Sequence, residues 1–170
     1  MPKKVRPVPK GHHTITPAIS VQGADAFIKF CKKAFGAKEL TRMKGPGGSI
    51  MHAEIEIGDS RLMLGDEHPS WGNKSAKTHG GTPVTLHIYV PDCDAVVANA
   101  VKAGAVTRMP LSDQFWGDRY GTVEDPFGNI WGIGTHIEDV DDKEMKRRMA
   151  KMAKDMAKAA SAASSATASA

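Results

Sequence analysis

The chain lacks any long hydrophobic run. Across its 170 residues no apolar stretch approaches the roughly 18–20 residues that a membrane-spanning helix requires. Residues 1–13 are basic but contain no apolar core, so they do not have the pattern of a secretory signal. We therefore expect a cytoplasmic protein with no membrane span.

Cysteine is also scarce. Only Cys31 and Cys93 occur, and they do not form a CxxC pair. Without an export signal both are expected to remain reduced, and cysteine is one of the residue types most often buried. We expect both to be small buried side chains.

Positive charge is sparse in the middle of the chain, although the net charge is +4 and the isoelectric point about 9.1. Residues 1–10 carry a net +4 and residues 143–158 a net +5, which leaves residues 11–142 near −5. A nucleic-acid-binding protein places positive charge across its folded face. We therefore expect no nucleic acid partner.

Hydrophobic periodicity predicts the same elements twice. Residues 13–21 alternate as a strand that Pro17 interrupts, and residues 24–35 form an amphipathic helix that Gly36 ends. Three strands follow, at residues 38–43, 49–57 and 61–65. Beyond a linker, a strand, a helix and further strands recur, at residues 83–90, 93–103, 105–109 and within 111–133.

The two halves also match residue by residue. Thr16–Val21 aligns with Thr85–Val90, and Thr41–Met43 aligns with Thr107–Met109. Each half has one helix and cannot cover the apolar side of its own sheet, so the halves are expected to share an interior. The predicted fold class is α+β, built from two tandem βαβββ modules.

Six segments follow from this pattern. They are a basic extended arm (1–12), a first module (13–67), a linker (68–82), a second module (83–138), a basic helix (139–160) and an Ala/Ser-rich tail expected to be disordered (161–170). The basic helix carries one stripe of methionines, at positions 145, 149, 152 and 156. We expect the stripe to dock on the body or on a dimer partner, with a membrane surface or an acidic partner as the alternative.

Several motifs resemble those of the vicinal oxygen chelate superfamily, which includes glyoxalase I, bleomycin- and fosfomycin-resistance proteins and extradiol dioxygenases. The motifs are TPAISV, KKAFGA, MHAEIEIGDS, THGGTPVTLHIYV and DQFWGDRYGTVEDPFGN, and the chain looks closest to the PhnB-like group. The resemblance covers about residues 14–140. It implies an eight-stranded half-open barrel with helices outside, a concave binding face and a homodimer.

Strand parity assigns side chains to faces without help from the family. On residues 49–57, Met51, Ala53, Ile55 and Ile57 are apolar and should lie under the helix. The residues between them, His52, Glu54 and Glu56, should point the other way. So should His87 and Tyr89 on the first strand of the second module. The alternative is that these polar residues form a solvated stripe on a half-covered sheet.

A second group of candidates comes from the aromatic-rich stretch 111–133. Its upstream part mixes aromatic side chains with Asp118 and Arg119, which suits a loop over a pocket. With the strand residues, the candidate ligand-binding set is His52, Glu54, Glu56, His87, Tyr89, Trp116, Arg119 and Trp131. Indole and phenol rings would form walls, and a planar or cationic ligand would suit a pocket that also bears carboxylates.

The resemblance also implies a divalent metal held by four ligands, one from the first and one from the last strand of each module. Alignment of the halves places those positions at Ala18, Met63, His87 and Gly132. Only His87 offers an imidazole or oxygen ligand to a divalent ion. We therefore expect no metal cofactor, with a rebuilt site of His52, Glu54 and His87 as the alternative.

Three functions remain open at this point. The preferred hypothesis is a small-molecule-binding protein that sequesters its ligand without turnover. A second is a metal-dependent lyase, isomerase or dioxygenase of the glyoxalase type. A third is a metal-free acid–base enzyme using His52 or His87 with Glu54. Family resemblance alone cannot choose among them, because one scaffold carries many chemistries.

Overall fold

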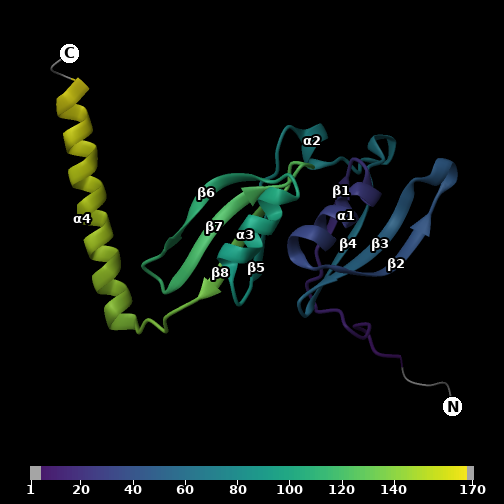
Figure 1. Cartoon of the computed structure of the whole chain (residues 1–170), viewed down its shortest axis with the longest axis horizontal. Helices are drawn as coiled ribbons and strands as arrows, with labels where there is room; N and C mark the ends of the chain where they lie inside the picture. Colours follow the sequence, from purple (N-terminus) through teal and green to yellow (C-terminus); the bar gives the residue numbers. More distant parts are fainter. Residues whose placement is uncertain (1–4, 168–170) are drawn as a thin grey trace.

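The chain folds into two four-stranded mixed sheets with their helices (Figure 1). The computed structural model describes residues 5–167, with side chains through residue 158. The first module comprises β1 (Ala18–Val21), α1 (Ala24–Phe35), β2 (Lys38–Lys44), β3 (Ile50–Ile57) and β4 (Ser60–Asp66). The second comprises β5 (Thr85–Tyr89), α3 (Cys93–Lys102), β6 (Val106–Asp113), β7 (Asp118–Glu124) and β8 (Ile130–His136). Short helical turns lie at Pro46–Gly48, Pro69–Trp71 and α2 (Ala76–His79), and the chain ends in α4 (Asp142–Thr167).

Both modules have the same topology. The strand orders are β1-β4-β3-β2 and β5-β8-β7-β6, with β1 parallel to β4 and β5 parallel to β8. This confirms the α+β fold and the two βαβββ modules. Within the described residues no hydrogen-bonded ladder joins the two sheets, so the eight strands form two sheets whose inner edges are β1 and β5.

A shared aromatic core joins the modules. Phe27 of α1 packs edge-on against Phe127, from the turn between β7 and β8, with ring centroids 5.4 Å apart. Phe35 lies 4.4 Å from the ring of Trp131 on β8, and α1 also packs against α3. Cys31 is buried in this core, where burial raises the pKa of its thiol, as expected for an inert small side chain.

The predicted parity of β3 holds except at Met51. Ala53 and Ile55 are fully buried under α1, but Met51 is exposed and Ile50 takes its place in the core. The cause is a bulge: the β2–β3 register shifts so that Met43 pairs with His52 while Lys44 pairs with Ile50. One extra residue reverses the facing of every residue before it.

The first strand is shorter than its pattern predicts. Alternation from residue 13 suggested a strand through 21, but β1 begins at Ala18, directly after Pro17. Residues 5–17 instead run as an arm that brings His12 against the first sheet. The start of the arm, residues 1–4, lies outside the described residues.

Helix α4 stands away from the body (Figure 1). Its base is attached by Arg148, which pairs with Glu138 at 2.7 Å and donates to the carbonyl of Phe115. Residues 161–167, expected to be disordered, are helical, consistent with the high helix propensity of alanine; residues 168–170 lie outside the described residues. Met149, Met152 and Met156 are exposed, so the stripe does not dock on its own body. None of the helices described within residues 5–167 has the length and apolar character to cross a membrane.

Candidate functional site

Each sheet has one face covered by its helix and one face turned away from it, which we call the open face. On β3, Ala53 and Ile55 point to the helix, so His52, Glu54 and Glu56 lie on the open face of the first sheet. On β5, Leu86 and Ile88 pack on the core, so His87 and Tyr89 lie on the open face of the second. Five of the candidate residues therefore lie on these two open faces.

The open face of the first sheet is organised around Glu54. Its carboxylate accepts from Nη1 of Arg61 at 3.2 Å, and Nε2 of His52 lies 3.5 Å away. The arm supplies His12, whose Nε2 lies 3.4 Å from the same carboxylate and whose side chain is 8% exposed. The carboxylate that was expected to attract a cationic ligand is therefore already surrounded by basic groups of the chain itself.

The open face of the second sheet holds an aromatic cluster. The rings of His87 and Tyr120 stack with centroids 5.2 Å apart and planes 5° from parallel, and Tyr89 lies 4.6 Å from His87. Gly132 lies beneath this stack. A Cβ there would come within 2.6 Å of the Tyr120 hydroxyl and 3.1 Å of Nδ1 of His87. The stack therefore depends on glycine in β8.

Asp118, at the start of β7, collects three donors although it is only 3% exposed. It accepts from the Tyr89 hydroxyl at 3.0 Å and from the Trp116 indole at 2.9 Å, and Nδ1 of His136 lies 2.7 Å away. Burial acts to raise the pKa of Asp118, but the bonds from His136, Tyr89 and Trp116 outweigh it and lower that pKa. The sequence pattern drew attention to Asp118 only as part of the aromatic-rich stretch and not as a candidate residue, and it missed His136. Extending the parity of β8 past Gly132 and Gly134 would have placed His136 on this face.

We expect the Asp118–His136 pair to depend on pH in both directions. Bonds to Asp118 and then Asp139 raise the pKa of His136, so the stability that the pair contributes is present at low pH and lost as pH rises through that raised value. In acid, the same stabilisation is lost as the pH falls through the lowered pKa of Asp118, because the carboxylate becomes protonated. NMR titration should show the pKa of His136 above about 6.5 in the native chain and lower in Asp118→Asn. An unchanged titration in that variant would contradict the pairing.

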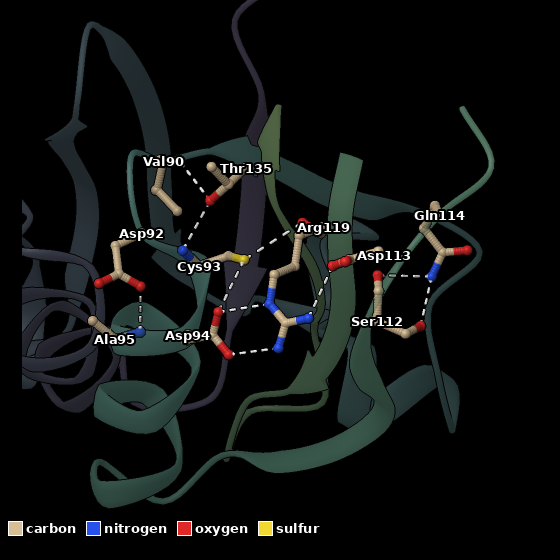
Figure 2. A network of polar contacts seen from close by, with 10 residues as sticks. All are labelled: Val90, Asp92, Cys93, Asp94, Ala95, Ser112, Asp113, Gln114, Arg119 and Thr135. Carbon is tan, nitrogen blue, oxygen red and sulfur yellow. Dashed lines mark hydrogen bonds and ion pairs between the residues drawn. The ribbon is translucent and has the colours of Figure 1, made fainter. Parts of the chain in front are cut away.

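Arg119 does not lie with the other candidates. It follows Asp118 on β7 and therefore points to the opposite, helix-covered side. Figure 2 shows its guanidinium between Asp94 of α3, at 2.7 and 2.8 Å, and Asp113 of β6, at 3.0 Å. Hydrogen bonding to Arg119 in turn lowers the pKa of Asp94. Arg119 was expected to anchor a ligand on the concave face, but the structure places it on the helix-covered side, because β7 begins at Asp118 where a loop was expected.

Trp131 lies in the core. It is 1% exposed, packs against Phe35, and donates its indole N–H to Asp125 at 2.9 Å. It borders the cavity described next from the core side and is not a free aromatic wall. Trp71 also forms no binding wall here: it is exposed in the linker and stacks on His68.

A cavity of about 1160 Å³ lies between the inner edges of the two sheets. The arm, β1, the start of β4, the linker and β5 line it, so both modules contribute. Its apolar lining consists mainly of Ile15, Ile19, Ile57, Leu62, Leu86 and Ile88. Of the eight candidate residues, His87 and Trp131 border it, whereas the remaining six do not.

The residues present do not fit the superfamily's metal centre. The four implied positions do meet in two pairs, because Ala18 is opposite Met63 and His87 is opposite Gly132. Three of them offer no oxygen or imidazole ligand to a divalent ion. Beside Gly132 the Tyr120 hydroxyl takes up the space that a side chain would need. Among the described residues no three His, Cys, Asp or Glu side chains gather to hold a metal, which also applies to the alternative set of His52, Glu54 and His87.

Comparisons with known proteins agree with this architecture. Residues 11–133 match the model of the Glyoxalase/Bleomycin resistance protein/Dioxygenase superfamily. A Mycobacterium bovis protein, Uncharacterized protein Mb0911c, is 43% identical over 135 residues, covering 78% of this chain and 89% of that protein. The Arabidopsis thaliana structure of At5g48480 has a TM-score of 0.58 at 27% identity, covering 71% and 97% of the two chains. The PhnB protein of Bacillus cereus, at 14% identity, shares the fold with a TM-score of 0.55 over 72% and 99%.

Proposed function

This chain belongs to the glyoxalase/bleomycin resistance protein/dioxygenase superfamily, and we propose that it is a small-molecule-binding protein whose ligand occupies the cavity between its modules. The cavity itself is the observation that carries the proposal. At about 1160 Å³ it exceeds the roughly 300–1,000 Å³ typical of ligand sites. Its lining combines branched apolar side chains with polar and basic ones, so it offers both apolar contact and hydrogen-bonding groups to a ligand.

Binding without the superfamily's metal chemistry is the form of this proposal that the residues support. Ala18, Met63 and Gly132 replace three of the implied ligands, and Tyr120 fills the space beside the fourth position. The metal-dependent alternative would need a different ligand set. The acid–base alternative through Glu54 is weakened because Arg61 and His12 already contact its carboxylate.

The Asp118–His136 pair favours an acid–base enzyme as a second candidate. A buried carboxylate that orients an imidazole is the arrangement that general bases use, and Nε2 of His136 is held 3.0 Å from the exposed Asp139. The Tyr89 hydroxyl, bonded to the same Asp118, stands beside it. A turnover activity that Asp118→Asn removes and His52→Ala leaves intact would favour this candidate over binding alone.

We further propose that the protein is a cytoplasmic homodimer and that the methionine stripe of α4 contacts the second copy. The stripe is exposed in one chain, at Met149, Met152 and Met156. Residues 143–158 carry a net +5 and residues 11–142 near −5, so the helix of one copy complements the body of another. An amphipathic helix gains stability mainly by burying its apolar face.

Native mass spectrometry of freshly purified protein tests both proposals. We expect a mass of two chains plus a retained small molecule. Ala18→Phe, which places a ring at the cavity wall on β1, should reduce the retained ligand by about tenfold or more while leaving the dimer intact. Val106→Phe is the matched control, because this exposed residue lies on β6 away from the cavity. Equal ligand loss in both variants, or none in either, would count against the cavity.

A further inference from the structure

The charge of the cavity lining differs in sign from the charge of the body around it. The titratable side chains that border the cavity are His13, Arg61, Lys74, His79 and His87. Within the described lining there is no aspartate or glutamate. Residues 11–142 as a whole are near −5, so a random sample of this surface would include carboxylates. The basic lining is therefore a property of the cavity and not of the chain.

Arg61 borders the cavity, and the arm and Glu54 occupy only part of its guanidinium. Its Nη1 bonds to Glu54 at 3.2 Å and lies 3.3 Å from Nδ1 of His12, and its Nε is buried beside Gly11. Among the described residues, Nη2 makes no hydrogen bond and is therefore the donor left for a ligand. A ligand oxygen that accepts from Nη2 would pair a donor that this chain leaves without a partner. The planar guanidinium presents adjacent N–H groups that match the oxygens of a carboxylate or phosphate.

The rest of the lining defines the other end of the ligand. Leu62 follows Arg61 on β4, Ile57 pairs with the neighbouring Ser60 from β3, and Leu86 and Ile88 flank His87 on β5. Arg61 and His87 are thus adjacent to branched apolar side chains that can cover a hydrocarbon or aromatic body. Lys74 is exposed and lies in the linker, where its ammonium adds positive charge to the cavity lining.

We infer that the ligand is an organic anion, with an apolar body held between β1 and β5 and an anionic head (carboxylate, phosphate or sulfonate) on Arg61. This inference rests on the proposed function and narrows it to a ligand class. It replaces the sequence-based expectation of a cationic ligand. That expectation relied on Glu54 and Glu56, neither of which borders the cavity.

Two dyes with the same ring system isolate the contribution of the charge. 8-Anilinonaphthalene-1-sulfonate carries a sulfonate, and N-phenyl-1-naphthylamine is its uncharged counterpart. Fluorescence titration of the full chain should give the sulfonate dye about tenfold tighter binding than the neutral dye. Arg61→Gln should weaken the sulfonate dye by about tenfold and leave the neutral dye within about twofold. Ala18→Phe should remove both.

A second variant protects the test if Arg61→Gln unfolds. Lys74→Gln changes an exposed residue and should weaken only the sulfonate dye, by about threefold, with less effect at high salt. Lys38→Gln, on β2 and outside the lining, is the control. Equal affinity for the two dyes, both lost in Ala18→Phe, would overturn the anion class but leave the cavity as a binding site. Dye binding that Ala18→Phe does not change would overturn the proposed function as well.

Discussion

Asp125→Ala is expected to lower the free energy of unfolding by about 3–5 kcal/mol and the melting temperature by roughly 10 °C. Asp125 is 3% exposed and accepts four hydrogen bonds, two of them from the backbone of Phe127 and Asn129. The other two come from the Asn129 amide and the Trp131 indole, each at 2.9 Å. Truncation leaves these donors buried and unpaired. Urea unfolding followed by circular dichroism measures the loss.

Asp59→Ala is the control for this prediction. Asp59 lies in the β3–β4 turn and accepts only from the hydroxyl of Ser60, so its removal should change stability by less than about 0.5 kcal/mol. Asp125→Asn keeps one acceptor oxygen and should fall between the two. If Asp125→Ala were as stable as Asp59→Ala, the turn would not depend on this carboxylate.

Gly117→Ala should also be strongly destabilising, by about 3 kcal/mol or more. Gly117 has φ of 98°, a conformation that side chains disfavour, and a Cβ there would overlap the carbonyl oxygen of Glu138. The segment that follows β8 also holds Gly117 in place, because the N–H groups of Ile137 and Glu138 donate to the Gly117 carbonyl at 2.9 and 3.0 Å. The backbone cannot yield without losing these bonds.

Gly128→Ala is the comparison that separates the cost of a positive φ from the cost of a steric overlap of the new Cβ. Gly128 has φ of 86°, but a Cβ there meets nothing closer than 3.4 Å. It should cost only about 1–2 kcal/mol, the penalty for a left-handed alanine. Gly117→Ala should also lower the pKa of His136, because Gly117 directly precedes Asp118, the partner of His136. NMR titration would detect this change. Equal losses in the two variants would show that φ alone sets the cost.

The local sequence pattern was sufficient to predict the fold, because helix termination by glycine and alternation along a strand both depend on residues that are neighbours in the sequence. Gly36 ends α1 at the predicted place with φ of 65°, and alternation placed His52, Glu54 and His87 on the open faces. The bulge at Met51 was not visible, since it arises from the pairing of β3 with β2 and not from either strand alone. Alternation can assign faces only within an unbroken register.

The site was harder to predict because it depends on contacts between distant segments. The sequence predicts a pocket that bears carboxylates, but it gives no sign that His12 reaches Glu54 across more than forty positions of sequence. Arg119 was misplaced because its partner Asp94 belongs to a helix that precedes it by 25 residues. Neither pairing has a local signal. Composition, by contrast, did indicate the separation of charge between body and α4, because that property needs no coordinates.

The aromatic packing between Phe27, Phe127 and Trp131 has a consequence for how the duplicated sequence behaves as a whole. Although each half repeats the other's plan, the helix of the first half rests on a turn and a strand of the second. Neither module should fold on its own, because it would expose the aromatic rings that the other module covers. We therefore expect both modules to unfold in one cooperative transition, so that a destabilising substitution in either module lowers the stability of the whole.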